Sequence, residues 1–328
     1  MTSGNLKNIR VGALAVAALT LSASLAVAQS YPTKQMTVLC GFAAGGGGDI
    51  ICRYYAEKIA ARSGQTAIVE NKVGALGALA ASAVARAKPD GYTLLITPGT
   101  ATHASHQVVF AKPHYDPVKD FTFVTTLNRT PFFLVTNPKI VPANTVRELA
   151  DWGKTKQGKV KTGGSTTTSI LASEILRQAT GMDLIHASYK SAQVAMTDLT
   201  AGELDFAFCD PGLAIGYIQS ATVRPLAVAS PVRSTILTDI PTMGEAGYQG
   251  FEMAGWWAAY LPAKTPEPIV AKLRQWLDEI VLSDDAKQFF RNAGIDMFPR
   301  GNLDLVKFQA SETEKYARLY KLANIQPQ

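Results

Sequence analysis

The chain alternates short apolar runs with segments whose apolar residues repeat at helical spacing. The first strand is expected at 36–40, and a glycine-rich stretch, GFAAGGGGD, separates it from a helix at 50–62. In that helix Ile51, Tyr55 and Ile59 fall on one face. The next elements are expected at 67–70 (strand), 78–87 (helix) and 92–97 (strand). Because strands that alternate with helices are typical of parallel sheets, this region predicts a doubly wound α/β domain.

The same alternation starts again near residue 159 and predicts a second α/β domain. A strand at 159–162 precedes the hydroxyl-rich sequence GGSTTTS and a helix at 170–179. Further strands of this domain are expected at 205–208 and 224–229.

Two strongly β-forming stretches, 121–136 and 251–261, lie between these regions, and amphipathic helices are expected from 266 to 322. Because the chain would cross between the domains twice, we expect the first domain to be discontinuous. The predicted division is one domain formed by 29–130 together with 256–328, and a second formed by 131–255. Two crossing strands would form a hinge that permits clamshell closure.

The amino-terminal residues have the pattern of a secretory signal peptide. Lys7 and Arg10 are followed by an apolar stretch of small residues at 11–27, which ends in AVA before Gln29. A transmembrane helix is a weaker interpretation, because the stretch is rich in Ala and Ser and only just reaches the length of a span. We therefore predict that residues 1–28 are removed and that the mature chain is periplasmic.

The charge of the chain favours a small anionic partner. The full sequence has a net charge of +6, and loss of the leader would remove two of its positive charges. A mild positive field suits anionic small molecules. Nucleic-acid binding is disfavoured, because the basic residues are spread along the chain and form no stripe interleaved with aromatic residues.

The three cysteines, Cys40, Cys52 and Cys209, allow at most one disulfide bond in an oxidising compartment. A bond between Cys40 and Cys52 is conceivable. The apolar surroundings of all three residues favour buried free thiols instead.

The glycine-rich stretch after the first strand does not match a nucleotide-binding motif, since it lacks both a Gly-Lys-Ser/Thr ending and a G-x-G-x-x-G spacing. The backbone amides of 43–48 would instead face outward at the positive end of the following helix. Such a turn can bind a carboxylate without a charged side chain. Asp49 is expected to be the amino-terminal cap of that helix.

The hydroxyl-rich loop takes the equivalent place in the second domain, ahead of a helix. Its hydroxyls offer donors to carboxylate oxygens, although one of them must cap the helix. The two loops would act as a pincer on one acid group. The residues of this second loop are Ser165, Thr166, Thr167, Thr168 and Ser169.

Catalytic and metal sites fit the sequence less well. A hydrolase that uses Ser165 with His186 lacks the G-x-S-x-G frame and a recognisable third partner. His103 and His106 lie three residues apart and could form a partial metal pair, but no acidic or thiol ligand is near them in the sequence. We expect this segment to be a polar loop near the cleft, and we predict that the protein is not an enzyme.

Several segments resemble the Bug family of periplasmic receptors, which serve tripartite tricarboxylate transporters. The similar segments extend from residue 31 to about residue 293 and occur in the expected order. They are GFAAGGGGD, AKPDGYTLL, YDPVKDFTFV, RPLAVASPVRS, IPTMGEAGYQGFE and LPAKTPEPIVAKL. The resemblance implies a two-domain type II periplasmic-binding-protein fold of the Venus flytrap kind, without a cofactor, that holds a small carboxylate largely through backbone amides and bridging waters.

The resemblance also assigns site residues by their position in the family's motifs. The first-domain loop corresponds to Phe42, Ala43, Ala44, Gly45 and Gly46. Thr102 and His103 match a polar segment of the family, the run from Ser165 to Ser169 matches its second loop, and Tyr189, Lys190 and Asp205 match two further stretches. Lys190 is more simply a solvated surface residue, and Asp205 a structural hydrogen-bonding group.

The resemblance implies that the partners are the small carboxylate and the membrane subunits of a tripartite transporter, and we expect the receptor to be a monomer. A ligand sensor that docks on a signalling receptor would use the same binding physics. The sequence does not separate these two roles.

The sequence departs from the family where ligands are selected, since Val73, Leu76 and Ala78 replace Pro, Gly and Asn of the usual pattern. These changes add apolar surface beside the expected pocket. Trp256 and Trp257 could stack on a ligand ring, although packing in the core explains them equally well.

We therefore expect an acid with one carboxylate and an aromatic or aliphatic body to bind more tightly than citrate. The apolar replacements favour burial of such a body and offer fewer polar partners to a tricarboxylate. Isothermal titration calorimetry with benzoate-type acids and with citrate measures the difference. Tighter binding of citrate would contradict this expectation.

Overall fold

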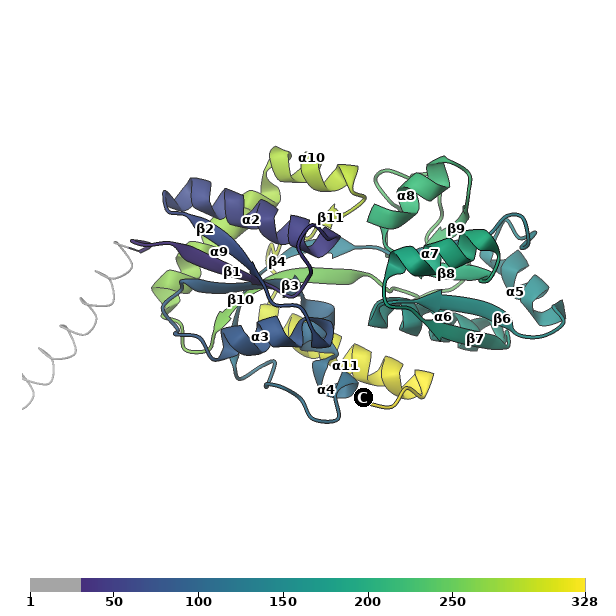
Figure 1. The fold of residues 1–328 in the computed structure, drawn as a ribbon, viewed down its shortest axis with the longest axis horizontal. Coiled ribbons are helices and arrows are strands. Elements are labelled where there is room, and N and C mark those ends of the chain that lie inside the picture. Colours follow the sequence, from purple (N-terminus) through teal and green to yellow (C-terminus); the bar gives the residue numbers. More distant parts are fainter. Residues whose placement is uncertain (1–30, 328) are drawn as a thin grey trace, which may run out of the picture. The chain divides into compact units, whose positions relative to one another are not determined.

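The computed structural model describes residues 31–327, and it shows a mixed α/β fold built on two β-sheets (Figure 1). The predicted signal peptide at 1–28 lies outside these residues. Within the described part of the chain, no helix is long and apolar enough to cross a bilayer.

The first sheet contains six strands in the order β11-β4-β10-β3-β1-β2. Its central strands are connected by helices, and β1 pairs in parallel with both β2 and β3. At one edge, β11 pairs antiparallel with β4. The strands are β1 (Met36–Cys40), β2 (Ala67–Asn71), β3 (Thr93–Pro98), β4 (Phe121–Thr130), β10 (Gly255–Pro262) and β11 (Asp296–Met297).

The second sheet contains five strands in the order β7-β6-β8-β5-β9. β6 pairs in parallel with β7 and β8, whereas β5 is antiparallel to both of its neighbours, β8 and β9. The strands are β5 (Phe133–Thr136), β6 (Val160–Gly164), β7 (Leu184–Ser188), β8 (Phe206–Cys209) and β9 (Arg224–Val228).

The sheets are not parallel throughout, since β5 and β11 run antiparallel to their neighbours. β5 follows β4 after two residues and not after a helix, so no βαβ crossover forces it to run parallel to its neighbours. β11 is a two-residue edge strand between two helices of the carboxyl-terminal region.

Helices connect most of these strands, and the amphipathic carboxyl-terminal segment forms three of them, as its periodicity predicts (Figure 1). The helices near the first sheet are α2 (Gly47–Ser63), η1 (Ala75–Gly77), α3 (Ala78–Ala85), η2 (Thr100–Ala104), α4 (His106–Val109) and α9 (Glu267–Leu282). The others are α5 (Val146–Thr155), α6 (Thr167–Thr180), α7 (Ala192–Ala201), α8 (Pro211–Gln219), α10 (Asp284–Asn292) and α11 (Leu305–Ala323).

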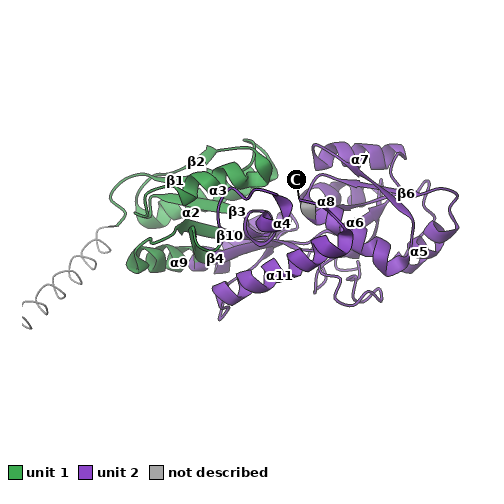
Figure 2. Ribbon diagram, turned by 90° about the horizontal axis from the view of Figure 1, so that it is seen from below, with its two compact units in different colours: residues 1–96, 118–124, 259–277 green, residues 97–117, 125–258, 278–328 purple. Residues whose placement is uncertain are grey.

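The chain divides into two compact units (Figure 2). Unit 1 comprises the residues up to 96 together with 118–124 and 259–277, and unit 2 comprises 97–117, 125–258 and the residues from 278 onward. The domain boundaries that the sequence suggests, at 130/131 and 255/256, stay a prediction.

The second sheet has its own hydrophobic core inside unit 2. Phe133 and Val135 of β5 are fully buried there, together with Leu199 of α7 and Val228 of β9. These buried residues stabilise the sheet, and the loops before α6 and α8 extend from the ends of its strands β6 and β8.

The cysteines also belong to the interior, because Cys40, Cys52 and Cys209 are all buried free thiols, as expected.

The amino terminus of α2 differs from the expectation. The cap position is Gly46, and Asp49 lies inside the first turn, so the prediction that Asp49 caps the helix is wrong. The buried Asp49 carboxylate accepts hydrogen bonds from the Gly45 amide at 2.8 Å, from Arg53 Nε at 2.7 Å and from Asn71 Nδ2 at 2.7 Å. Asn71 lies at the end of β2, a contact that helix periodicity alone could not predict.

These hydrogen bonds, the one from Arg53 above all, hold the pKa of Asp49 at about 2, below its ordinary value of 3.8. A carboxyl group whose pKa is lower in the folded state than in the unfolded state stabilises the fold at pH values above its unfolded-state pKa. The stabilisation is therefore complete above about pH 4 and is lost as the pH falls through 2.

Replacing Asp49 with Asn should lower the free energy of unfolding by about 1–2 kcal/mol at neutral pH, since Arg53 is half exposed and solvent weakens the ion pair. Urea unfolding of both proteins between pH 7 and pH 3 should show this difference falling to about half at pH 3. As a matched control, Asp151→Asn on the exposed face of α5 should change stability by less than about 0.5 kcal/mol. If Asp49→Asn lowered the free energy of unfolding equally at pH 7 and pH 3, the assignment of a lowered pKa to Asp49 would be contradicted.

Candidate functional site

The glycine-rich turn before α2 uses part of its own backbone to hold its shape. Gly45 has a φ of 78°, a conformation that favours glycine, and its amide donates to the Asp49 carboxylate. The Gly46 amide donates to the carbonyl of Ala43 at 3.1 Å. The expectation that all amides of 43–48 face outward is therefore wrong for Gly45 and Gly46, because internal acceptors already occupy them.

Other amides of the same turn remain available. Among the described residues, the amides of Ala44, Gly47 and Gly48 have no hydrogen-bond acceptor. Gly47 and Gly48 occupy the first turn of α2, where the helix dipole is positive. Phe42 packs its ring on this turn, since a Cβ on Gly48 would lie only 2.4 Å from that ring.

An apolar segment lies directly beside this turn within unit 1. A Cβ on Gly41 would lie 2.7 Å from the Cα of Gly77, so the two backbones are in close contact. Val73, Leu76 and Leu79 of this segment expose 57%, 47% and 47% of their surfaces. The replacements that the sequence shows at 73 and 76 therefore do present apolar surface next to the first loop.

Thr102 and His103 lie in the buried helical turn η2, in unit 2. The Thr102 hydroxyl donates to the Pro98 carbonyl at 3.0 Å and lies 2.9 Å from His103 Nδ1, and the Tyr115 hydroxyl donates to the Thr102 carbonyl at 2.7 Å. Burial lowers the pKa of His103 well below its ordinary value, so its ring is neutral.

His106 packs in the same interior, with its ring stacked on Tyr115 at 3.9 Å, and burial lowers its pKa to about 4. The expectation of a polar loop here is wrong, because both histidines are fully buried. Within residues 31–327, no group of three or more His, Cys, Asp and Glu side chains is arranged to hold a metal ion.

Two hydroxyls of the hydroxyl-rich loop before α6 form the helix cap. The Thr166 hydroxyl accepts from the Ser169 amide, and the Ser169 hydroxyl accepts from the Thr166 amide, each at 3.2 Å. Thr168 is buried in the first turn of the helix. Ser165 is half-buried, and no partner for its hydroxyl occurs among the described residues.

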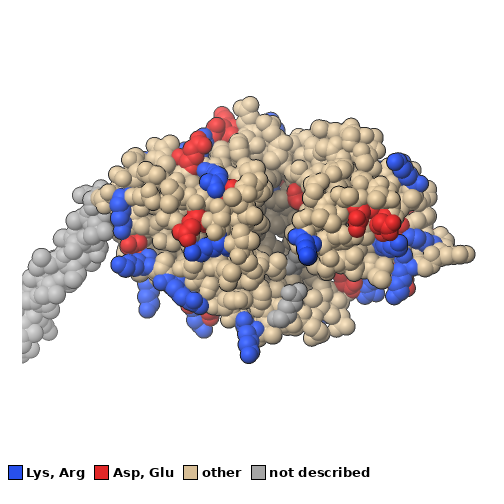
Figure 3. Space-filling view, viewed as in Figure 1, with Lys and Arg blue, Asp and Glu red and all other residues tan. Residues whose placement is uncertain are grey.

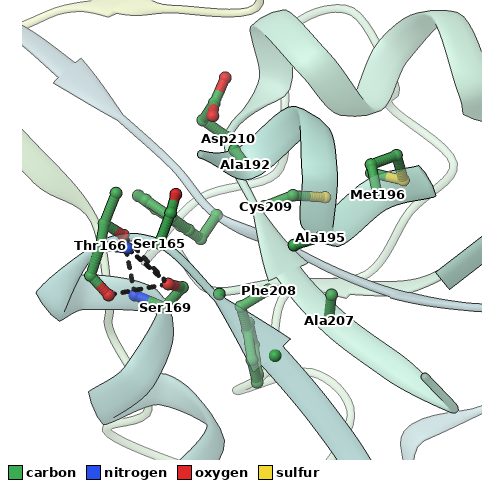
Figure 4. Close-up of a pocket in the computed structure, with 13 residues that line it drawn as sticks. Ser165, Thr166, Ser169, Ala192, Ala195, Met196, Ala207, Phe208, Cys209 and Asp210 are labelled. Carbon is green, nitrogen blue, oxygen red and sulfur yellow. Dashed lines mark hydrogen bonds between the residues drawn. The ribbon is translucent and has the colours of Figure 1, made fainter. Parts of the chain in front are cut away.

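Ser165 lines an open pocket in unit 2, at the carboxyl ends of β6 and β8, whose empty space of about 310 Å³ includes open solvent (Figure 4). Because these two strands are parallel neighbours, they end at the same edge of the sheet, and the helices that follow them begin there. No Lys or Arg lines this cavity. Its lining residues are Phe132, Gly163, Gly164, Ser165, Thr166, Ser169, Ala192, Ala195, Met196, Ala207, Phe208, Cys209 and Asp210.

Asp210 is a lining residue that the sequence interpretation missed. It caps α8, where its Oδ1 accepts from the Leu213 amide at 3.2 Å and Pro211 takes the first helical position. Burial raises the pKa of its carboxyl group. An Asp followed by Pro directly after a strand is the pattern of a helix start, so this position could have been found from the sequence.

Two predicted site residues do not line this cavity. The Tyr189 hydroxyl donates to Asp198 Oδ2 at 2.7 Å, an interaction that helps to raise the pKa of Tyr189 to about 12 after burial, its main cause. Asp205 lies at the opposite end of β8 from Cys209, where it pairs with Lys156 and accepts from the Lys161 amide at 2.6 Å. Both side chains are satisfied by the protein.

Ser165 and His186 line different cavities, so the structure does not form the pair that a hydrolase would need. Trp256 is buried, and its indole nitrogen donates to Glu312 Oε2 at 2.9 Å. This contact favours a packing role for Trp256 over ring stacking. On the face drawn in Figure 3, basic and acidic side chains are interspersed, so neither sign dominates it.

Comparison with known proteins identifies relatives of this arrangement. Residues 51–325 match the family model described as tripartite tricarboxylate transporter family receptor. A protein of Agrobacterium vitis, described as a UPF0065 protein in the TAR-I ttuE-ttuC' intergenic region, is 33% identical over 298 residues, which cover 88% of this chain and 84% of the relative.

Solved structures agree with this result. The R. palustris protein Rpa4515 with adipate has a TM-score of 0.80 at 29% identity, and the match covers 91% of this chain and all of that one. The periplasmic binding protein BugD has a TM-score of 0.76 at 29% identity, with the same coverage. The predicted α/β fold class and the resemblance to Bug receptors are confirmed. The chain belongs to the tripartite tricarboxylate transporter receptor family, whose members are solute-binding proteins.

Proposed function

We propose that this protein is a periplasmic receptor that captures a small organic carboxylate in the cavity at the ends of β6 and β8. The observation that carries the proposal is the Ser165 hydroxyl, which lines this cavity and has no partner within the described residues. Thr166 and Ser169 are committed to the helix cap. Ser165 is therefore a hydroxyl of the loop that can donate to a bound acid.

The cavity can attract an anion although no basic side chain lines it. α6 has 14 residues, and its amino end carries the positive part of the helix dipole, which stabilises an anion by about 0.3–1 kcal/mol. The hydroxyl of Ser165 adds a hydrogen bond to a charged acceptor, a kind of bond that is stronger than a neutral one. Recognition of the acid would thus rest on uncharged dipoles.

The rest of the cavity suits an apolar ligand body. Phe132, Met196, Phe208 and Cys209 line it and supply apolar surface. Burial of a ligand against such side chains contributes about 25 cal/mol per Å² of apolar surface. In unit 1, the exposed apolar side chains at 73, 76 and 79 support the same preference.

The first loop is proposed as a second carboxylate-binding element of this protein. The amides of Ala44, Gly47 and Gly48 support this role, because they are donors at a helix amino terminus that lack acceptors among the described residues. Thr102 and His103 stay predicted ligand contacts. The internal hydrogen bonds of Tyr189 and Asp205 favour a scaffold role for both.

The domain division and the partners belong to the same proposal. The six strands of the first sheet fall within 29–130 and 256–328, apart from Gly255 at the start of β10, and the five strands of the second fall within 131–255, which supports two domains joined by crossing strands. The receptor would be exported through its leader and would deliver its acid, as a monomer, to the membrane subunits of a tripartite transporter. The adipate bound to the R. palustris relative supports a carboxylate as the ligand.

A thermal-shift screen of mono- and dicarboxylates should give at least one stabilising acid, because a ligand that binds only the folded state raises its melting temperature. For that acid, Ser165→Ala should weaken binding by roughly tenfold while leaving the unliganded melting temperature unchanged. Calorimetry measures the affinity.

The matched control is Ser220→Ala at the exposed carboxyl end of α8, which should bind the acid as the wild type does. Absence of stabilisation by any acid in the panel would contradict the proposed function. Equal affinities of Ser165→Ala and Ser220→Ala would show that the acid is held elsewhere.

A further inference from the structure

Asp210 is the one carboxylate among the residues that line the cavity, and it has no cationic partner in the described part of the chain. Asp210 is partly exposed, and the buried aspartates differ from it in this respect. Asp49 pairs with Arg53, and Asp205 pairs with Lys156. A carboxylate in a protein interior is ordinarily paired with a cation, because burial without one costs several kcal/mol.

The helix cap accounts for only part of the Asp210 carboxylate. Oδ1 accepts from the Leu213 amide at 3.2 Å, and the amides of Asp210 and Gly212 also stabilise the carboxylate, but no side chain in the described part of the protein donates to it. A cap position at a helix amino terminus ordinarily favours the charged form of an Asp. Burial outweighs that effect here and raises the pKa of the group, which agrees with a carboxylate that lacks a full set of partners.

The position of Asp210 conflicts with a simple acid as the ligand. Asp210 and Ser165 both line the cavity, at the starts of the helices that follow β8 and β6 (Figure 4). A bound carboxylate near Ser165 would meet a second negative group. A hydrogen-bond donor on the ligand would remove this conflict, since it could donate to the Asp210 carboxylate, which has no side-chain donor among the described residues.

We propose that Asp210 makes the receptor selective for carboxylic acids that carry a hydrogen-bond-donating substituent, an ammonium or a hydroxyl group, over acids that carry none. This inference rests on the proposed function, because it concerns the same cavity. Ser165 and the amino end of α6 bind the acid group, and Asp210 accepts from the neighbouring donor. Two helix amino termini would thus recognise the ligand: the start of α6, with the Ser165 hydroxyl, would bind the acid group, and the start of α8, with the Asp210 carboxylate, would bind the donor substituent.

The test compares acids that share one carbon skeleton. Succinate, malate and aspartate form one series, and 3-phenylpropanoate, phenyllactate and phenylalanine form the other. Calorimetry on the full mature chain gives the affinity of each acid for the wild type, for Asp210→Asn and for Asp304→Asn. Asn is as good a helix cap as Asp, so Asp210→Asn should keep the start of α8 intact.

Asp304→Asn is the matched control, because Asp304 also caps a helix, with its Oδ1 accepting from the amides of Val306 and Lys307 at 3.1 Å. Asp304 is exposed and does not line the cavity. The same chemical change there should leave every affinity as in the wild type. Melting temperatures of the unliganded variants report whether each protein folds.

In at least one series, the wild type should bind an ammonium or hydroxyl acid about tenfold or more tightly than the unsubstituted acid. Asp210→Asn should reduce this ratio to near one, by weakening the substituted acids and by strengthening the unsubstituted acid as the repulsion is removed. Preference for aspartate or phenylalanine identifies the donor as an ammonium group, and preference for malate or phenyllactate identifies it as a hydroxyl group.

Unsubstituted acids that bind the wild type as tightly as their substituted partners would overturn the inference while leaving the proposed function intact. The same conclusion would follow if the preference persisted in Asp210→Asn. Failure of all acids to bind would instead contradict the proposed function itself, and the inference with it.

Discussion

The parallel pairing of β6 with β8 is the constraint on which the candidate site depends. Thr162 of β6 lies opposite Phe206 of β8, so the two strands end at one edge of the sheet. Each is followed by a helix whose amino end begins at that edge, and each helix needs a capping side chain. The cavity is therefore formed by residues that the fold must place there for structural reasons, which are Thr166 and Asp210 as caps and Ser165 beside them.

The capping requirement also explains why so few polar groups remain for a ligand. Thr166 and Ser169 satisfy each other in a capping box, and Gly45 and Asp49 satisfy each other in the first loop. Most of the polar atoms that a sequence interpretation would assign to a ligand are thus needed to hold the two loops. The groups left over, the Ser165 hydroxyl and a few backbone amides, are the ones on which binding would depend.

A comparison of Asp49 with Asp210 shows how pairing separates structural from functional carboxylates. Asp49 has a cation and two neutral donors, and its pKa is lowered, whereas the partly exposed Asp210 has backbone amide donors but no cation, and its pKa is raised. The former group is stabilised by the protein itself. The latter is stabilised only in part, as is common for groups that meet a ligand.

Local sequence determined much of this protein. The alternation of apolar runs and helical periodicity placed most strands within two residues of their observed ends, and the glycine-rich and hydroxyl-rich turns fell where the helices begin. These features depend on neighbouring residues, so the sequence contains them directly. The motifs also identified the family, because short segments in a fixed order are specific as a set.

Tertiary structure alone decided which of those residues are free to act. Asp49 is engaged by Asn71, which lies 22 positions away, and Asp205 by Lys156, which lies 49 positions away. His103 and His106 are buried because distant elements pack around them, and no local pattern reveals that burial. Hydrogen bonds and burial between residues far apart in the chain determine whether a polar group is satisfied, and this is the property that the sequence by itself could not supply.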